Sequence, residues 1–148
     1  MPEKPWEYTL HIPNDPRAVP ICRRTLRLVL AAHALPHLSH DAELLGTELV
    51  TNAVTHTKGP VALRVRWTGA ALRVGAWDAE PTPPMPGPFG VRATGDGAEA
   101  GRGLALVRAC ADDWGWHRLT YAGKYVWCEL AGVAPRTGAS ANRTGPRA

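Results

Sequence analysis

The sequence contains few cysteines and lacks the long apolar segments that mark several classes of protein. Its three cysteines, Cys22, Cys110 and Cys128, are an odd number without paired spacing. This pattern argues against a disulfide scaffold and favours a reducing cytosol. The longest apolar stretch, residues 26–35, is interrupted by an arginine and a histidine and is too short to span a bilayer. The first ten residues lack a basic segment followed by an apolar run, so we expect no signal peptide and a cytoplasmic location.

Basic residues only slightly outnumber acidic ones in the body of the chain. The formal net charge is +4, and three of these charges are arginines in a tail without acidic residues. The rest of the chain has no visible basic stripe, so direct binding of nucleic acid is not expected. With 148 residues, 45% of them hydrophobic, the chain is long enough for one domain with a core. We predict a domain over residues 1–131 and a flexible tail over residues 132–148.

Hydrophobic periodicity predicts the secondary structure. Alternation of apolar and polar residues predicts strands at residues 6–11, 61–67, 71–78, 114–119 and 125–130. Helices are predicted at residues 18–34, from a cap at Ser39 or Asp41 to Lys58, and from Gly101 to near Gly115. This order predicts an α+β fold of two layers, in which helices cover one face of a mostly antiparallel sheet.

Four features along this order of elements carry polar side chains or glycines. Glu48 and Asn52 are four residues apart and share one face of the second helix. Asp78 ends a strand, and Gly101 and Gly103 open the last helix after a segment rich in proline and glycine. Taken singly, these are a solvated helix face, a turn residue and a structural loop. Taken together in this order, they indicate a magnesium-nucleotide site.

Four short segments carry a family resemblance: ELVTNAVTH at residues 48–56, the strand-ending Trp-Asp pair, GRGLALV at 101–107 and GKYVW at 123–127. In this order they resemble the GHKL ATPase superfamily of histidine-kinase and gyrase-type ATP-binding domains. Within it, they are similar to the small serine-kinase anti-sigma factors and their actinobacterial relatives. The resemblance covers about residues 6 to 131. It implies the Bergerat-type fold, ATP and Mg²⁺ as cofactors, and an ATP lid at residues 79–100.

The resemblance also implies a role for individual residues. Glu48 corresponds to the catalytic base, and Asn52 to the residue that holds Mg²⁺ and contacts ATP. Asp78 corresponds to the acceptor of the adenine amino group, and Gly101 and Gly103 to the glycines whose backbone approaches the phosphates. Further nucleotide contacts are expected at four positions: His56, Arg102, Leu104 and Lys124.

The activity implied is that of a serine/threonine protein kinase resembling anti-sigma factors. It would phosphorylate an anti-anti-sigma-type partner, bind a sigma factor, and form a homodimer. An alternative is a catalytically weak or inactive protein that acts only as an interaction module. Two departures from the family pattern favour this alternative. The loop after Asp78 lacks glycines, and Tyr125 replaces a small hydroxyl residue, so that its ring is expected near the adenine, where it could stack or obstruct.

The histidines of the first interhelical connection have a spacing that resembles a zinc site. His33, His37, His40 and Asp41 lie within nine residues. Pro36 prevents the first two histidines from sharing one regular helix. We therefore interpret this segment as a connector, and the cysteines at positions 110 and 128 as buried apolar side chains.

Overall fold

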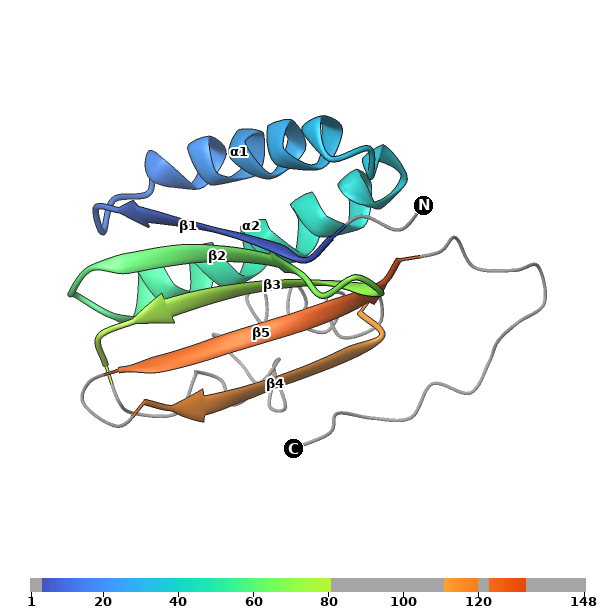
Figure 1. Ribbon diagram of the computed structural model, residues 1–148. Helices are drawn as coiled ribbons and strands as arrows, with labels where there is room; N and C mark the ends of the chain where they lie inside the picture. The colour runs from blue at the N-terminus through green and yellow to red at the C-terminus, as the bar shows by residue number, and fades with distance from the viewer. Residues whose placement is uncertain (1–3, 81–110, 120–122, 133–148) are drawn as a thin grey trace, which may run out of the picture.

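The computed structural model describes residues 4–80, 111–119 and 123–132. Its elements, in chain order, are β1 (Trp6–Ile12), α1 (Ala18–Ala32), the short 3₁₀ helix η1 (Pro36–Leu38), α2 (Ser39–His56), β2 (Val61–Trp67), β3 (Ala71–Asp78), β4 (Asp113–Arg118) and β5 (Lys124–Ala131). The five strands form one sheet in the order β1-β2-β3-β5-β4, and every neighbouring pair is antiparallel (Figure 1). The predicted α+β fold with a mostly antiparallel sheet is therefore confirmed.

Alternation along the strands divides the sheet into a helix-covered face and an open face. In β2 and β3, every second side chain joins the core beneath α2, and Figure 1 shows this helix behind the two strands. The side chains on this face are apolar except at one end, where Asp78 follows Leu72, Val74 and Ala76. The intervening side chains, such as Arg64 and Arg73, belong to the open face. The position of Asp78 on the helix-covered face is what makes it available to a site between helix and sheet.

Helix α2 is held in place by close packing against α1. Leu26 of α1 is fully buried, and a Cβ atom at Gly46 of α2 would collide with its Cδ1 atom. At the helix surface, Arg27 donates to Glu43 over 2.8 Å. Because glycine permits this close approach, α2 lies deep against α1 and the sheet. Neither helix in the described residues is both long and apolar enough to cross a membrane.

The structure corrects four predicted helix ends, and the first is that α2 ends at His56 and not at Lys58. Residues 113–115, predicted as the end of the last helix, already belong to β4. The N-cap of α2 is Leu38 and not Ser39 or Asp41, because the helix already begins at Ser39, whose hydroxyl donates to Glu43 over 2.5 Å. Helix α1 ends at Ala32, since Ala34 has a positive φ of 60°.

Several predictions concern residues that the structure does not describe. They are residues 81–100 of the predicted lid, the start of the last helix with Gly101, Arg102, Gly103 and Leu104, Cys110, and the tail from residue 133.

Candidate functional site

The polar side of α2 carries the first two candidate residues. The buried side of this helix includes Leu49, Val50 and Ala53, which belong to the core. Glu48 and Asn52 are partly buried and lie one turn apart at the border of the buried face. Burial raises the pKa of the Glu48 carboxyl above its ordinary value. A carboxylate with a raised pKa has a greater tendency to take up a proton, as a general base must.

The C-terminal end of α2 lies at the end of the sheet where β3 terminates. The Asn14 side chain donates to the carbonyl oxygens of Thr57 and Gly59, over 3.1 and 2.8 Å, and so fixes the connection from α2 to β2. A Cβ atom at Gly59 would lie 3.3 Å from the Cβ atom of Ala79, the residue after β3. The last turn of α2, which contains the exposed His56 and follows Asn52 by one turn, therefore lies at the same end of the sheet as the C-terminus of β3.

Asp78 is a buried carboxylate at this end of the sheet, with only 2% of its surface exposed. Its Oδ1 atom accepts hydrogen bonds from Lys124 Nζ, over 3.0 Å, and from the backbone N–H of Glu80, over 2.9 Å. Burial raises the pKa of Asp78, and the Lys124 hydrogen bond acts in the opposite direction. Neither of these two hydrogen bonds involves the second carboxylate oxygen, Oδ2. The carboxylate thus retains an acceptor oxygen.

Lys124 reaches Asp78 because the β4–β5 connection approaches β3 closely. Gly123 has a φ of 86°, and a Cβ atom there would collide with the backbone carbonyl of Asp78. The register places Lys124 directly opposite Asp78, and its ammonium also donates to the Glu80 carbonyl over 3.1 Å. Lys124 is itself only 4% exposed. The sequence indicated Lys124 as a nucleotide contact but gave no sign of this ion pair.

Tyr125 lies on the open face of the sheet, opposite the face that carries Asp78. It follows Lys124 in an extended strand, so the two side chains point to opposite faces. A Cβ atom at Gly75 would collide with the Tyr125 ring, which therefore covers this glycine on the open face. The expectation that this ring lies near the adenine acceptor was wrong. The ring can neither stack on nor obstruct a base bound at Asp78.

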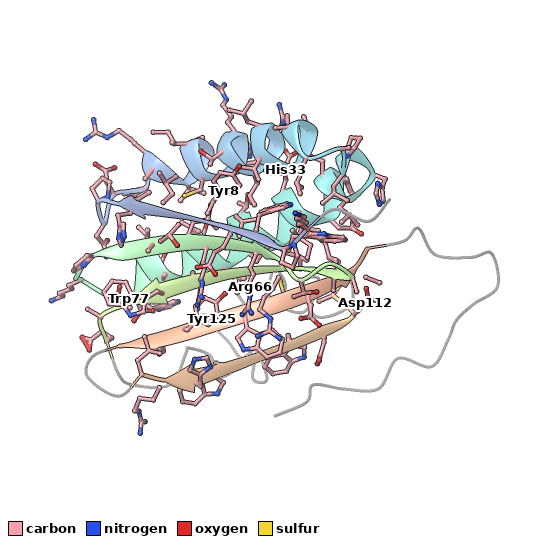
Figure 2. All side chains as sticks on the ribbon, viewed as in Figure 1. Tyr8, His33, Arg66, Trp77, Asp112 and Tyr125 are labelled. Atoms are coloured by element: carbon pink, nitrogen blue, oxygen red, sulfur yellow. The ribbon has the colours of Figure 1, made fainter. Side chains whose placement is uncertain are left out.

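The open face contains a groove that the sequence did not predict. Its volume is about 340 Å³, and its lining includes Ala62, Trp77, His117 and Tyr125 from four strands. Figure 2 shows Trp77 and Tyr125 on this face of the sheet. Trp77 and Tyr125 are opposite each other in the register of β3 and β5, as are Ala62 and Trp77 in β2 and β3. The groove is separated from Asp78 by the thickness of the sheet.

The histidines between α1 and α2 make structural contacts. His33 hydrogen-bonds the Tyr8 hydroxyl over 2.7 Å and stacks on Trp6, and Figure 2 labels the first pair near the end of α1. His37 Nε2 lies 2.9 Å from the Gly132 carbonyl oxygen. Among residues 4–80, 111–119 and 123–132, no group of three histidine, cysteine or acidic side chains could hold a metal ion.

The described residues form a two-layer α+β domain in which α2 carries Glu48 and Asn52, and β3 ends at Asp78 on the helix-covered face of an antiparallel sheet. A family model for the histidine kinase-like ATPase domain matches residues 12–129. The chain therefore belongs to the histidine kinase-like ATPase family, part of the GHKL superfamily, and membership of this family implies ATP binding. The chain is also 39% identical over 94 residues to an uncharacterized protein of Streptomyces coelicolor, covering 60% of this chain and 84% of that protein.

The described residues provide chemistry that suits Mg-ATP. Asn52 offers a neutral amide oxygen, which is a ligand that Mg²⁺ accepts together with phosphate oxygens and water. Asp78 offers a buried carboxylate oxygen to a base amino group, and Glu48 offers a partly buried base. Mg²⁺ would neutralise charge on the phosphates when bound.

Proposed function

We propose that this protein is an ATP-dependent serine/threonine protein kinase resembling anti-sigma factors. Its substrate would be a small anti-anti-sigma-type protein, and it would regulate transcription by binding partner proteins in the cytoplasm. The observation that carries the proposal is the pair of partly buried side chains, Glu48 and Asn52, one turn apart on α2. Their helix, α2, ends at the same end of the sheet as β3, whose last residue is the buried Asp78.

Each residue of this site has a distinct role in the proposal. Glu48 takes the proton of a serine or threonine hydroxyl as that oxygen forms a bond to the transferred phosphoryl group. Asn52 holds Mg²⁺ through its amide oxygen. Asp78 accepts a hydrogen bond from the amino group of adenine, and ADP is the leaving group. Phosphoryl transfer depends mainly on positioning and charge neutralisation, so one base on a rigid helix is sufficient.

Two variants on α2 test these roles separately. Asn52→Ala should abolish Mg²⁺-dependent ATP binding in calorimetry, whereas Glu48→Gln should bind Mg-ATP like the wild type. With purified anti-anti-sigma-type proteins as acceptors, Glu48→Gln should lose phosphate transfer by about 10²-fold or more. Thr55→Ala, an exposed change on the same helix, is the matched control. Transfer at the wild-type rate by Glu48→Gln would exclude this mechanism.

A second candidate function is that of an interaction module without kinase activity. The observation that favours it is the exposed side of α1, where Ile21 and Leu28 are 57% and 70% exposed. These apolar side chains are seven residues apart and lie on one face, with Arg24 between them. Such a mixture of apolar and basic groups suits an acidic, amphipathic segment of a partner protein.

The two functions make different predictions for a partner protein that binds. In the module, complex formation with an anti-anti-sigma-type protein or sigma factor is unchanged by Asn52→Ala and by the removal of ATP. In the kinase, the same partner becomes phosphorylated on serine or threonine, and Leu28→Ser lowers transfer by raising KM rather than by lowering kcat. Mass spectrometry of the partner after incubation with Mg-ATP distinguishes these outcomes.

A further inference from the structure

The predicted adenine acceptor is joined to a lysine that is almost completely buried. Lys124 donates to Asp78 Oδ1 and to the Glu80 carbonyl, and both side chains of the ion pair are at least 95% buried, with 5% and 2% of their side-chain surface exposed. An ammonium group removed from water requires partners of this kind. The hydrogen bond from Lys124 to Oδ1 thus orients the carboxylate and favours its ionised form against the effect of burial.

The charge state of Asp78 determines which base it can accept. An ionised carboxylate is only an acceptor, whereas a protonated carboxyl also donates a hydrogen bond. A 6-amino purine such as adenine offers N–H donors at position 6, and a 6-oxo purine such as hypoxanthine offers a carbonyl acceptor there. An ionised Asp78 therefore suits adenine, and a protonated Asp78 suits hypoxanthine.

We propose that Lys124 is a positioning residue that holds Asp78 as an ionised acceptor. Lys124 thereby sets the preference of the site for 6-amino over 6-oxo purines. This inference rests on the proposed function. The two bonds that converge on Oδ1 leave Oδ2 to face the base.

Burial without Lys124 would favour the neutral form of Asp78. Desolvation is the largest influence on the Asp78 carboxyl and raises its pKa, and the Lys124 hydrogen bond is the largest influence that lowers it. The charge of Glu80 also raises this pKa, whereas its backbone N–H lowers it. Among the described residues, further titratable or charged side chains at this end of the sheet include His56 at the end of α2, Lys58 in the connection that follows it, and Arg118, which is opposite Lys124 in β4.

The test is the affinity for Mg-ATP and Mg-ITP, measured by calorimetry between pH 5.5 and 8. In the wild type, the ratio of the two affinities should favour ATP and remain constant over this range. In Lys124→Met, ATP affinity should fall as the pH decreases, by about tenfold for each pH unit below the new pKa of Asp78. ITP affinity should rise over the same range, because the protonated carboxyl can donate to its carbonyl oxygen.

Two further variants serve as controls for this profile. Lys124→Arg, which retains a cationic donor, should restore the constant preference for ATP. A His56→Gln background removes the titration of that side chain from the profiles. The wild-type profile is a test that does not require the methionine variant to fold. A fall in its ATP preference between pH 8 and 5.5 would mean that Asp78 titrates despite Lys124, and would overturn the inference.

The failure of this inference differs from the failure of the proposed function. Absence of binding of either nucleotide by the wild type would refute the proposed function. Binding of ATP by the wild type, with equal and pH-independent losses for both nucleotides in Lys124→Met, would refute only the inference. That result would make Lys124 a purely structural residue or a direct contact to the phosphates or ribose.

Discussion

Replacing Gly123 by alanine should damage both the stability of the fold and the site at Asp78. Gly123 has a φ of 86°, a conformation that residues with a Cβ atom adopt only at a cost. A Cβ atom there would also collide with the Asp78 carbonyl and would lie 3.0 Å from the Ala79 Cα atom. Both neighbours are backbone atoms, which cannot turn away as the end of a side chain can. The chain segments must therefore separate.

The structure offers a matched control at the β2–β3 turn. Gly69 has a φ of 101°, but the nearest atom to an added Cβ is Pro5 Cγ at 4.0 Å. Gly69→Ala should therefore incur only the backbone strain, about 1–2 kcal/mol. Gly123→Ala should incur the same strain and the effect of forced separation, about 1–3 kcal/mol more. Since the separation displaces the Asp78 carboxylate, only Gly123→Ala should weaken Mg-ATP binding.

Urea unfolding at equilibrium measures the two losses in free energy of unfolding, and calorimetry measures ATP affinity. Wild type, Gly69→Ala and Gly123→Ala are compared at the same pH and salt concentration. Equal losses of stability for the two variants would show that the close approach of Gly123 to Asp78 has no energetic importance. A normal ATP affinity in a destabilised Gly123→Ala variant would show that the β4–β5 connection does not contribute to nucleotide binding.

Two further predictions concern the open face and the helix pair. Tyr125→Phe removes a buried hydroxyl that has no hydrogen-bond partner among the described residues, so the free energy of unfolding should stay within about 1 kcal/mol of the wild type. Mg-ATP affinity should be unchanged, and a clear loss in calorimetry would contradict the placement of the ring on the open face. Glu43→Gln should slightly lower stability at pH 7, because hydrogen bonds from Arg27 and Ser39 lower the pKa of Glu43 below 4.5 in the folded state. A lowered folded pKa stabilises the protein above the unfolded pKa, so the difference from wild type should disappear as the pH falls through the folded pKa. Urea midpoints at pH 7, 5 and 3 check this, and a difference that does not decrease as the pH falls would assign it to packing.

Where the hydrophobic periodicity is clear, the bounds of the elements could be predicted from the sequence almost to the residue. The two central strands, Val61–Trp67 and Ala71–Asp78, have the predicted bounds. Their apolar residues alternate, and the turn between them contains Gly69, whose positive φ suits glycine. The last helix was predicted to end near Gly115, although Trp114 and Trp116 had also been assigned to the strand that follows it. In the structure their alternation belongs to β4.

The parts of the site that depend on strand register could not be predicted. The spacing of Glu48 and Asn52 is a property of one helix and can be recognised locally. The pairing of Asp78 with Lys124 requires the register of β3 against β5, which are separated by 45 residues in the chain. That same register decides which face Tyr125 occupies, because a shift of one residue would exchange the two faces. Sequence reasoning therefore assigned Lys124 and Tyr125 to the same neighbourhood.

The glycine-poor loop after Asp78 is weaker evidence for an inactive site than the sequence suggested. Glycines in such a loop allow other backbone segments to approach closely. Here that close approach is provided by glycines of neighbouring segments. Cβ atoms at Gly59 and Gly123 would lie 3.3 Å from the Ala79 Cβ atom and 3.0 Å from its Cα atom, respectively. The residue after Asp78 can therefore carry a side chain without widening the site. Since Tyr125 lies on the other face, one of the two departures that favoured an interaction module loses its physical basis, and the kinase is the hypothesis to test first.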